Sequence, residues 1–370
     1  MKIVIFGLSV TSSWGNGHAT LLRGLLKALR DLGHVTRFFE RDTPYYAAHR
    51  DAPFLSFAQV HLYSDWNENL PLAHRELIDA DVGIVTSYCP DGVAACRLVL
   101  ESSVERKIFY DMDTPVTLDR IDKGESVPYI PPEGLGGFDL VLSYTGGASL
   151  NRLRNQLSAR RVATLYGWVD PATHYRRATL DRFQCDLSYL GTYSQDRQDG
   201  LRKLLLEPAA KLSDKKFVIA GAMYPEVNRW PSNVRYYDHI APPEHPAFYS
   251  SSLLTLNVTR ASMAETGYCP SGRLFEAAAC GTCVLSDWWE GLDRFFEPRD
   301  EILIATSESE AIDAISTDAS ALTAIGSKAR TRVLDCHTAD IRARRLIDLI
   351  EMPSAESTES HQYSLAAEGA

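Results

Sequence analysis

His18 is the first residue in the chain whose type and position could do chemistry. It follows an apolar run at residues 2–8 and stands where a helical pattern begins. The positive end of a helix dipole disfavours an imidazolium ion, so a histidine there tends to stay neutral and can act as a general base. Asp111, at the end of a later apolar run, could orient His18 or stabilise its charge if the two loops converge. The structural alternative is a histidine that caps its helix or packs on Trp14.

The loop that contains His18, SSWGNGHAT, has two glycines but neither of the known phosphate-binding spacings. A dinucleotide-binding loop would read GxGxxG directly after the strand, and a P-loop would contain GKS or GKT. The glycines would instead let the backbone approach a ligand, and YTGG at residues 144–147 could do the same or form a plain tight turn. The residues that we predict to contact an acceptor or a phosphate are Trp14, Gly15, Asn16, Gly17, Gly146 and Gly147.

Asp111 and Asp113 are spaced like a pair of carboxylates that could hold a divalent cation. Asp113 is also followed by Thr114 and Pro115, which is the pattern of a helix start with aspartate as the cap and proline in the first turn. We favour the cap for Asp113, which leaves Asp111 at the tip of the strand and predicts no metal site.

The segment PSGRLFEAAACG predicts a helix that opens at Ser271 and ends at Gly281. Arg273 lies in its first turn, and a guanidinium beside a helix N-terminus makes an anion site that suits a diphosphate. Glu276 falls one turn further on the same side, where its carboxylate could accept two ribose hydroxyls. The alternative is an ion pair between the two side chains on a solvated surface, which is worth little. The small residues at 277–280 indicate tight packing and count against that alternative.

Further candidates follow other predicted strands in the second half. SDWWEGL at residues 286–292 places two tryptophans beside acidic residues, which is typical of a carbohydrate environment, although we expect one of the two tryptophans to pack in the core. Two arginines after earlier strands could add positive charge near a phosphate. The predicted donor-binding residues are Arg197, Arg260, Ser271, Gly272, Arg273, Glu276, Asp287 and Trp288.

Short β-rich runs that alternate with helical patterns must position all these loops. Such alternation predicts parallel sheets covered on both faces, whose ligands bind beyond the carboxyl ends of the strands. The pattern breaks at YGWVDPATHY and then starts again, so the sequence predicts an α/β fold of two doubly wound domains that face a central cleft. The predicted strands are 2–8, 34–40, 80–88, 107–111, 138–144 and 162–166, then 186–191, 216–220, 234–237, 253–258, 282–286 and 301–304.

Composition narrows the function classes. A formal net charge of −10 argues against a general nucleic-acid-binding protein. No apolar run reaches the roughly 20 residues of a membrane span, and the N-terminus is typical of a buried strand rather than a signal peptide. Seven scattered cysteines favour a reducing cytoplasm over a disulfide framework. Cys280 and Cys283 form a lone CxxC, which we interpret as two small residues at a helix end.

Several motifs together resemble the bacterial spore-maturation CgeB-like group of glycosyltransferases. They are SSWGNGHAT, YDMDTPVTL, LSYTGG, LGTYSQDRQ, LNVTRASM and PSGRLFEAAACG followed by LSDWWEGL, and the resemblance covers about residues 1–350. It implies the GT-B fold, with two Rossmann-like domains. The parts that it implies are an acceptor domain at 1–170, a nucleotide-sugar donor domain at 171–337 and a helix at 338–352 that crosses back to the first domain. The small, polar composition of residues 353–370 predicts a disordered tail.

The resemblance also implies roles for individual residues. Glu276 matches the donor-binding glutamate, and Arg273 stands where a diphosphate contact is expected. GNGHAT resembles the segment of inverting GT-B enzymes in which His18 would be the base and Asp111 its supporting acid. The likeness of GNGHAT favours inversion. The retaining pattern of two glutamates eight positions apart is not met, because Tyr268 occupies the earlier position and Glu265 is the nearest acid, and this departure leaves the stereochemistry open. No bound metal and no cofactor besides the nucleotide-diphosphate sugar are implied.

The sequence therefore predicts an enzyme that transfers a sugar from a nucleotide-diphosphate sugar to the hydroxyl of a sugar or glycan acceptor. Two alternatives remain open at this point. A UDP-sugar epimerase on the same fold would convert the donor without an acceptor. A non-catalytic sugar-binding or coat protein would bind the ligands without turnover.

Overall fold

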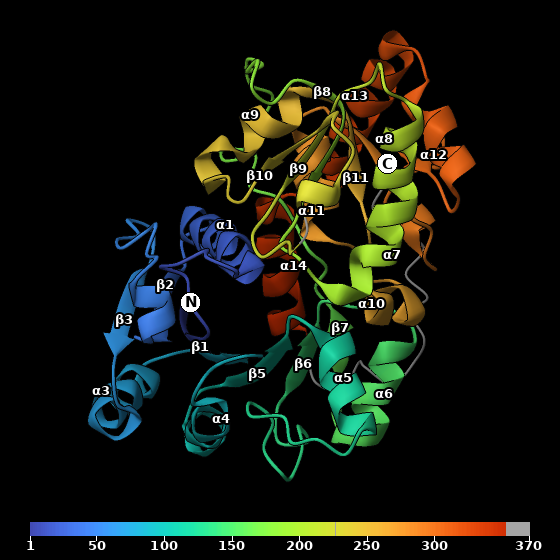
Figure 1. Ribbon diagram of the computed structural model, residues 1–370. Coiled ribbons are helices and arrows are strands. Elements are labelled where there is room, and N and C mark those ends of the chain that lie inside the picture. The colour runs from blue at the N-terminus through green and yellow to red at the C-terminus, as the bar shows by residue number, and fades with distance from the viewer. Residues whose placement is uncertain (226, 353–370) are drawn as a thin grey trace. The chain divides into compact units, whose positions relative to one another are not determined.

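The computed structural model describes residues 1–225 and 227–352, and it divides into two compact units (Figure 1). The first unit begins at Met1 and ends at Tyr166, and it also includes the helix α14 (Ala339–Glu351). The second unit is Gly167–Thr338. The chain thus leaves the first unit four residues before the boundary predicted at 170. The predicted disordered tail lies outside the described residues.

The first unit is built on a fully parallel seven-stranded sheet in the order β3-β2-β1-β4-β5-β6-β7. Helices α1 and α14 pack together on one face of this sheet, and α3 and α4 cover the other (Figure 1). All five residues of β4 are buried, as expected for a central strand covered on both faces. The strands are β1 (Lys2–Gly7), β2 (Val35–Arg41), β3 (Gln59–Tyr63), β4 (Val82–Thr86), β5 (Arg106–Asp111), β6 (Leu140–Ser143) and β7 (Val162–Thr164). The helices before α14 are α1 (Gly17–Asp31), α2 (Pro44–Ala47), α3 (Trp66–Ile78), α4 (Gly92–Glu101), α5 (Thr114–Asp122) and α6 (Ala148–Leu157).

Helix α14 is tied to the first unit through its last turn. Arg106 Nε donates to the carbonyl oxygen of Ile350 at 3.0 Å, and Arg161 Nη2 donates to that of Leu349 at 2.8 Å. The last carbonyls of a helix have no partner within the helix and carry the negative end of its dipole. Two arginines from the sheet side therefore both satisfy and neutralise the end of α14.

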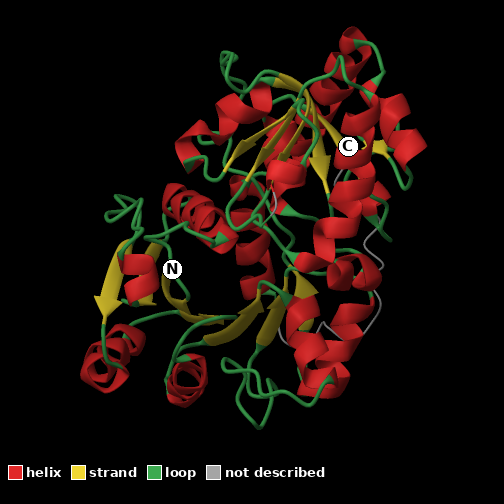
Figure 2. Ribbon diagram, in the orientation of Figure 1, coloured by secondary structure: helices red, strands yellow, loops and turns green. Residues whose placement is uncertain are grey.

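The second unit is built on a fully parallel six-stranded sheet in the order β10-β9-β8-β11-β12-β13 (Figure 2). In both units the sheet is parallel, as the sequence predicts, and α-helices form most of the connections between successive strands. The strands are β8 (Cys185–Leu190), β9 (Phe217–Ala220), β10 (Val234–Tyr237), β11 (Ser252–Asn257), β12 (Cys283–Ser286) and β13 (Leu303–Ile304). The helices are α7 (Gln198–Leu201), α8 (Glu207–Lys211), α9 (His245–Ser250), α10 (Ala261–Thr266), α11 (Gly272–Ala279), α12 (Glu308–Ile315) and α13 (Ala319–Cys336).

One strand of the first sheet was not predicted. β3, with sequence QVHLY, pairs only with β2 and lies at the edge of the sheet, where just one of its five residues is fully buried. An edge strand needs little apolar surface, so its composition does not stand out from a loop.

Two features bear on the environment of the protein. None of the seven cysteines, all of which lie in the described ranges, is in a disulfide; six of them are buried, and burial raises the pKa of Cys280 and of Cys283 to about 12. Among the described residues, no helix combines the length and the apolar character that a membrane crossing requires.

Candidate functional site

The carboxyl edge of the six-stranded sheet brings together the ends of β8, β11 and β12 and the start of α11. Asn257, the last residue of β11, donates from Nδ2 to Ser286 Oγ at the end of β12, at 3.0 Å. Its Oδ1 accepts from Arg273 Nη1 at 3.1 Å. Arg273 Nε also donates to the carbonyl oxygen of Leu190, the end of β8, at 2.6 Å. The Arg273 guanidinium thus joins the ends of β8 and β11, and Asn257 links them to the end of β12, at the edge where ligands bind in such sheets.

Space for the Arg273 guanidinium depends on Gly191. A β-carbon on Gly191 would lie 2.7 Å from Nη2 of Arg273 and 2.9 Å from the hydroxyl of Tyr189, which is closer than side chains pack. The guanidinium lies over the Tyr189 ring, with Cζ 5.0 Å from the ring centroid. Arg273 therefore turns toward the strand ends, and not toward Glu276 as a surface ion pair would require.

Arg197 supplies a second positive charge at this edge. Its Nη2 donates to the carbonyl oxygen of Thr192 at 2.6 Å, while its Nε is buried and has no hydrogen-bond partner in the described part of the chain. Burial lowers the pKa of Arg197, and the like charge of Arg273 lowers it further. Because burying a cation outside an ion pair is costly, two guanidinium groups at one edge favour an anion beside them.

The N-terminus of α11 adds backbone donors. Ser271 occupies the N-cap position, but its side chain makes no capping hydrogen bond. A β-carbon on Gly272 would meet no other atom within 4 Å, so the space in front of this first turn is open. The first N–H groups of a helix have no partner within the helix and attract anions.

The other predicted donor residues lie nearby but differ in what they do. Arg260, at the N-cap of α10, forms an ion pair with Asp196 at 3.4 Å. Both carboxylate oxygens of Asp287 accept from the backbone N–H of Thr259, at 3.1 and 3.0 Å, and burial raises the pKa of Asp287. Asp287 thus fastens two loops of the donor side together. Their roles toward a ligand stay predictions.

The two adjacent tryptophans separate as expected. Trp289 is only 2% exposed and packs against Phe295, whereas Trp288 is 48% exposed. The exposed ring is the one available to a ligand.

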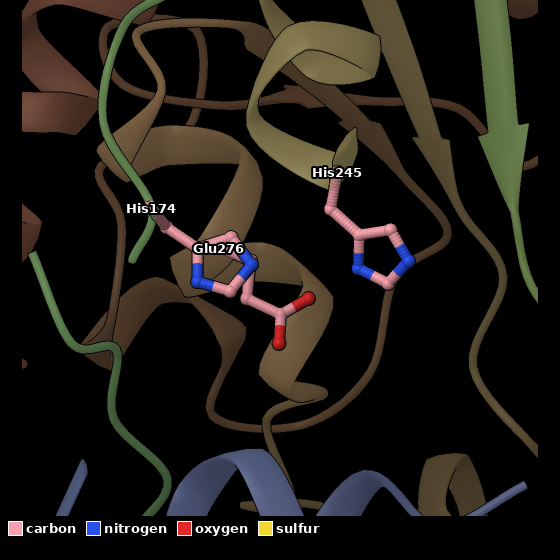
Figure 3. Close-up of side chains that lie close together, drawn as sticks. All are labelled: His174, His245 and Glu276. Atoms are coloured by element: carbon pink, nitrogen blue, oxygen red, sulfur yellow. The ribbon is translucent and has the colours of Figure 1, made fainter. Parts of the chain in front are cut away.

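Glu276, on the second turn of α11, lies beside two histidines that the sequence analysis did not single out. They are His174, which lies in the segment YGWVDPATHY where the pattern breaks, and His245, the first residue of α9 (Figure 3). No signal in the sequence links positions so far apart, because only the fold brings them to one place.

In the first unit, His18 lies in the first turn of α1 beside Tyr88. Their ring centroids are 5.8 Å apart, and the Tyr88 hydroxyl donates to Asp113 Oδ2 at 2.8 Å. Burial lowers the pKa of His18, and the charge of Asp113 partly opposes this effect. The acid whose charge acts on His18 is therefore Asp113. Its side chain bonds Tyr88 instead of capping α5, so the expected side-chain cap is wrong, although Asp113 does occupy the N-cap position.

Asp111, the predicted supporting acid, is fully buried at the end of β5. Its Oδ1 accepts from the backbone N–H of Asp113 at 3.1 Å, and burial raises its pKa to about 7. Asp111 thus holds the turn that presents Asp113. A direct role toward His18 stays a prediction.

Glu40 fixes the start of the glycine-bearing loop before α1 through hydrogen bonds. This completely buried carboxylate accepts from Ser9 Oγ at 2.8 Å, from the backbone N–H groups of Val10 and Thr11 at 2.7 and 3.0 Å, and from Thr11 Oγ1 at 2.5 Å. An acid at the end of the second strand would hold a ribose in a dinucleotide-binding domain. Here the oxygens of Glu40 accept hydrogen bonds from the loop itself, which agrees with the absence of the GxGxxG motif.

The remaining loop residues are placed as follows. Asn16 donates from Nδ2 to the carbonyl oxygen of Ser9 at 3.1 Å, and Trp14 stacks on His49 with ring centroids 4.2 Å apart. A β-carbon on Gly146 would lie 2.1 Å from the Tyr166 hydroxyl. Positive φ angles of 60° are found at Gly15 and Gly147, and Gly17 begins α1.

Comparison with known proteins decides the class. Residues 197–348 match a family model described as "Glycosyl transferase-like", and no curated protein sequence matches the chain. The chain is a glycosyltransferase of the GT-B fold. The matched segment begins at Arg197 and contains Arg273 and Glu276, and all of it up to Thr338 lies in the second unit.

Solved structures similar to this glycosyltransferase extend over nearly its whole length. Sucrose-phosphate synthase from Thermosynechococcus elongatus has a TM-score of 0.67 and 14% identity, with 94% of this chain and 98% of that chain covered. HepE from Anabaena, in complex with UDP and glucose, has a TM-score of 0.64 and 13% identity, with 94% and 99% covered. An α-glucosyltransferase in complex with UDP-glucose and DNA has a TM-score of 0.67 and 13% identity, with 95% and 100% covered.

Proposed function

We propose that this glycosyltransferase moves a sugar from a UDP-sugar to a hydroxyl of a sugar or glycan acceptor, without a bound metal or further cofactor. Two of the similar structures contain UDP or UDP-glucose, which favours uridine in the donor. One of them also contains DNA. A net charge of −10 disfavours a nucleic acid as the acceptor here, because phosphates need a basic face. The combination of sequence motifs favours the CgeB-like group within this class.

The proposal rests on one observation: the guanidinium groups of Arg197 and Arg273 lie at the same edge of the sheet without an acidic partner among the residues that the structure describes. Neither forms an ion pair with a described residue, and the buried Nε of Arg197 lacks a partner. A diphosphate beside both groups and the open first turn of α11 would compensate these charges. The same contacts would stabilise the charge that develops on UDP as it leaves.

The other donor contacts follow from position. Glu276 would accept the ribose hydroxyls, one helical turn beyond the diphosphate. Arg260 would add positive charge, and the exposed ring of Trp288 would stack on a sugar. Ser271 and Gly272 would offer backbone N–H groups, and Asp287 would keep the loops in place through Thr259.

His18 would be the base on the acceptor side. It would take the proton of the acceptor hydroxyl while that oxygen bonds to the anomeric carbon, and the bond between the anomeric carbon and the diphosphate would break, so that UDP leaves. The charge of Asp113, with or without Asp111, would stabilise the imidazolium ion that forms. A single displacement of this kind inverts the anomeric centre.

A thermal-shift comparison of UDP, GDP, TDP, ADP and CMP tests the proposal. A ligand that binds only the folded state at a hundred times its dissociation constant adds about 2.7 kcal/mol of stability. We expect UDP to raise the melting temperature most, and Arg273→Ala to remove this effect. A chain that no nucleotide stabilises would contradict the donor site.

A further inference from the structure

Three side chains from separate parts of the second unit point toward one another. His174 lies in the segment before β8, His245 opens α9, and Glu276 is on α11. One ring nitrogen of each histidine and a carboxylate oxygen of Glu276 all lie within 4.8 Å of one another (Figure 3). Two imidazoles and a carboxylate are a ligand set that zinc and related ions prefer.

Hydrogen bonds fix which nitrogen of His245 is turned toward the cluster. Its Nε2 lies 3.0 Å from the carbonyl oxygen of Ile240. A carbonyl only accepts, so Nε2 carries the proton and Nδ1 keeps a lone pair directed at the other two groups (Figure 3). A histidine that binds a metal ion typically donates its other N–H in this way.

His174 supplies the second observation. The side chain is 7% exposed, its Nδ1 lies 3.1 Å from Thr173 Oγ1, and its Nε2 is buried without a hydrogen-bond partner among the described residues. Figure 3 shows Nε2 directed toward Glu276 and His245. Buried polar atoms are nearly always paired, so an unpaired nitrogen that faces a second nitrogen and a carboxylate indicates a ligand between them.

We propose that His174 Nε2, His245 Nδ1 and the Glu276 carboxylate bind a divalent transition-metal ion of the zinc class. Ligand atoms around a tetrahedral zinc ion lie roughly 3.4 Å apart, so the three groups would close around the ion by side-chain rotation. Three protein ligands leave one position for water. The ion would neutralise the carboxylate and satisfy the orphan nitrogen of His174 together.

A consequence follows if Glu276 also holds the donor ribose, and this step rests on the proposed function. The carboxylate cannot offer the same oxygens to an ion and to two hydroxyls. The ion would therefore compete with the donor, and it would act as an inhibitor of a transfer that needs no metal.

Cobalt(II) binding to the untagged full-length chain tests the site directly, because a tetrahedral cobalt site with nitrogen and oxygen ligands absorbs visible light. We expect one equivalent to bind with this spectrum. His174→Ala, His245→Ala and Glu276→Gln should each weaken binding at least tenfold. His74→Ala, an exposed histidine of α3, is the matched control and should leave the spectrum unchanged.

Far-UV circular dichroism establishes that each variant is folded, and His174→Asn and His245→Gln replace any alanine variant that is not. Failure of the wild-type chain to bind cobalt, or binding that survives loss of either histidine, would overturn the site. A thiolate-to-cobalt band in the near ultraviolet would overturn it as well, since the ion would then be on cysteine.

The competition is measured separately by titrating UDP with and without saturating zinc. We expect zinc to raise the dissociation constant of UDP at least tenfold in the wild-type chain and not in His245→Ala. Equal UDP affinity in both states would refute the shared use of Glu276. Absence of UDP binding under all conditions would instead refute the proposed donor, while the cobalt result would stand on its own.

Discussion

The Arg273 guanidinium occupies the space that a side chain on residue 191 would fill, at the carboxyl edge of the second sheet. A β-carbon on Gly191 would lie 2.7 Å from Nη2 of Arg273. Glycine at position 191 therefore leaves room for the guanidinium. Because Nη2 is the end of a flexible side chain, an added methyl group would displace the guanidinium more readily than the backbone.

Gly191→Ala should therefore weaken UDP binding without unfolding the protein. Loss of one charge-assisted contact to the diphosphate costs about 1.5–3 kcal/mol, which corresponds to a rise of roughly 10- to 100-fold in the dissociation constant. Calorimetric titration with UDP and a melting curve measure the two effects. Ser232→Ala, exposed in another loop of the same unit, should change neither. A large fall in stability with unchanged UDP affinity would show that Gly191 matters for packing alone.

Arg197→Ala tests the second guanidinium. We expect UDP affinity to fall by a similar factor and the free energy of unfolding of the unliganded chain to fall little, since a buried unpaired charge is removed along with its contacts. Urea unfolding and UDP titration are measured on the same preparations. Arg75→Ala, an exposed arginine of the first unit, serves as the control. Unaltered UDP affinity in Arg197→Ala would place the diphosphate elsewhere.

The pH dependence of turnover tests His18 as the base. Burial lowers the pKa of His18 from its ordinary value of 6.5, so nearly all of the His18 side chains should be neutral at pH 7. Turnover should therefore fall only below pH 6.5. The charge of Asp113 raises that pKa, so Asp113→Asn should move the acid limb to still lower pH. His18→Ala should reduce turnover about 100-fold or more with UDP affinity unchanged. Turnover within a few fold of wild type would exclude His18 as the base.

Asp111 makes a prediction about stability. Burial raises its pKa from 3.8 to about 7, so the folded state binds a proton that the unfolded state releases. The contribution of this group therefore falls as pH rises from about 4 to 7, and above pH 7 its ionisation opposes folding. Asp111→Asn should raise the free energy of unfolding at pH 8 relative to pH 5, by roughly 1–4 kcal/mol. Urea unfolding at both pH values measures this, and parallel pH profiles for the two proteins would contradict the assignment.

Excess EDTA tests whether transfer needs a metal ion. We expect turnover to persist, because positively charged side chains are assigned the role of stabilising the leaving diphosphate. Any rise after chelation would agree with an inhibitory ion at Glu276. Loss of turnover that a divalent cation restores would instead favour a metal on the Asp111–Asp113 pair.

The sequence by itself determined the elements with strong local patterns. Twelve of the strands, the restart after residue 166 and the helix that begins after Ser271 follow from apolar runs and helix-start residues, which act over a few neighbouring positions. β3 was not predicted, because an edge strand buries little apolar surface and so lacks a clear apolar run. Identifying the carboxyl edge of each sheet as the site region needed only the parallel alternation of strands and helices.

Only the tertiary structure decided which side chains meet. It placed Asp113 where its charge acts on His18, and it used Asp111 to hold the turn that contains Asp113. It also turned Arg273 toward Asn257 and Leu190 instead of Glu276. It brought together His174, His245 and Glu276, which are separated along the sequence by 71 and then 31 positions. Such contacts have no local signature, because side-chain directions and the approach of distant segments depend on how all helices pack on the sheet.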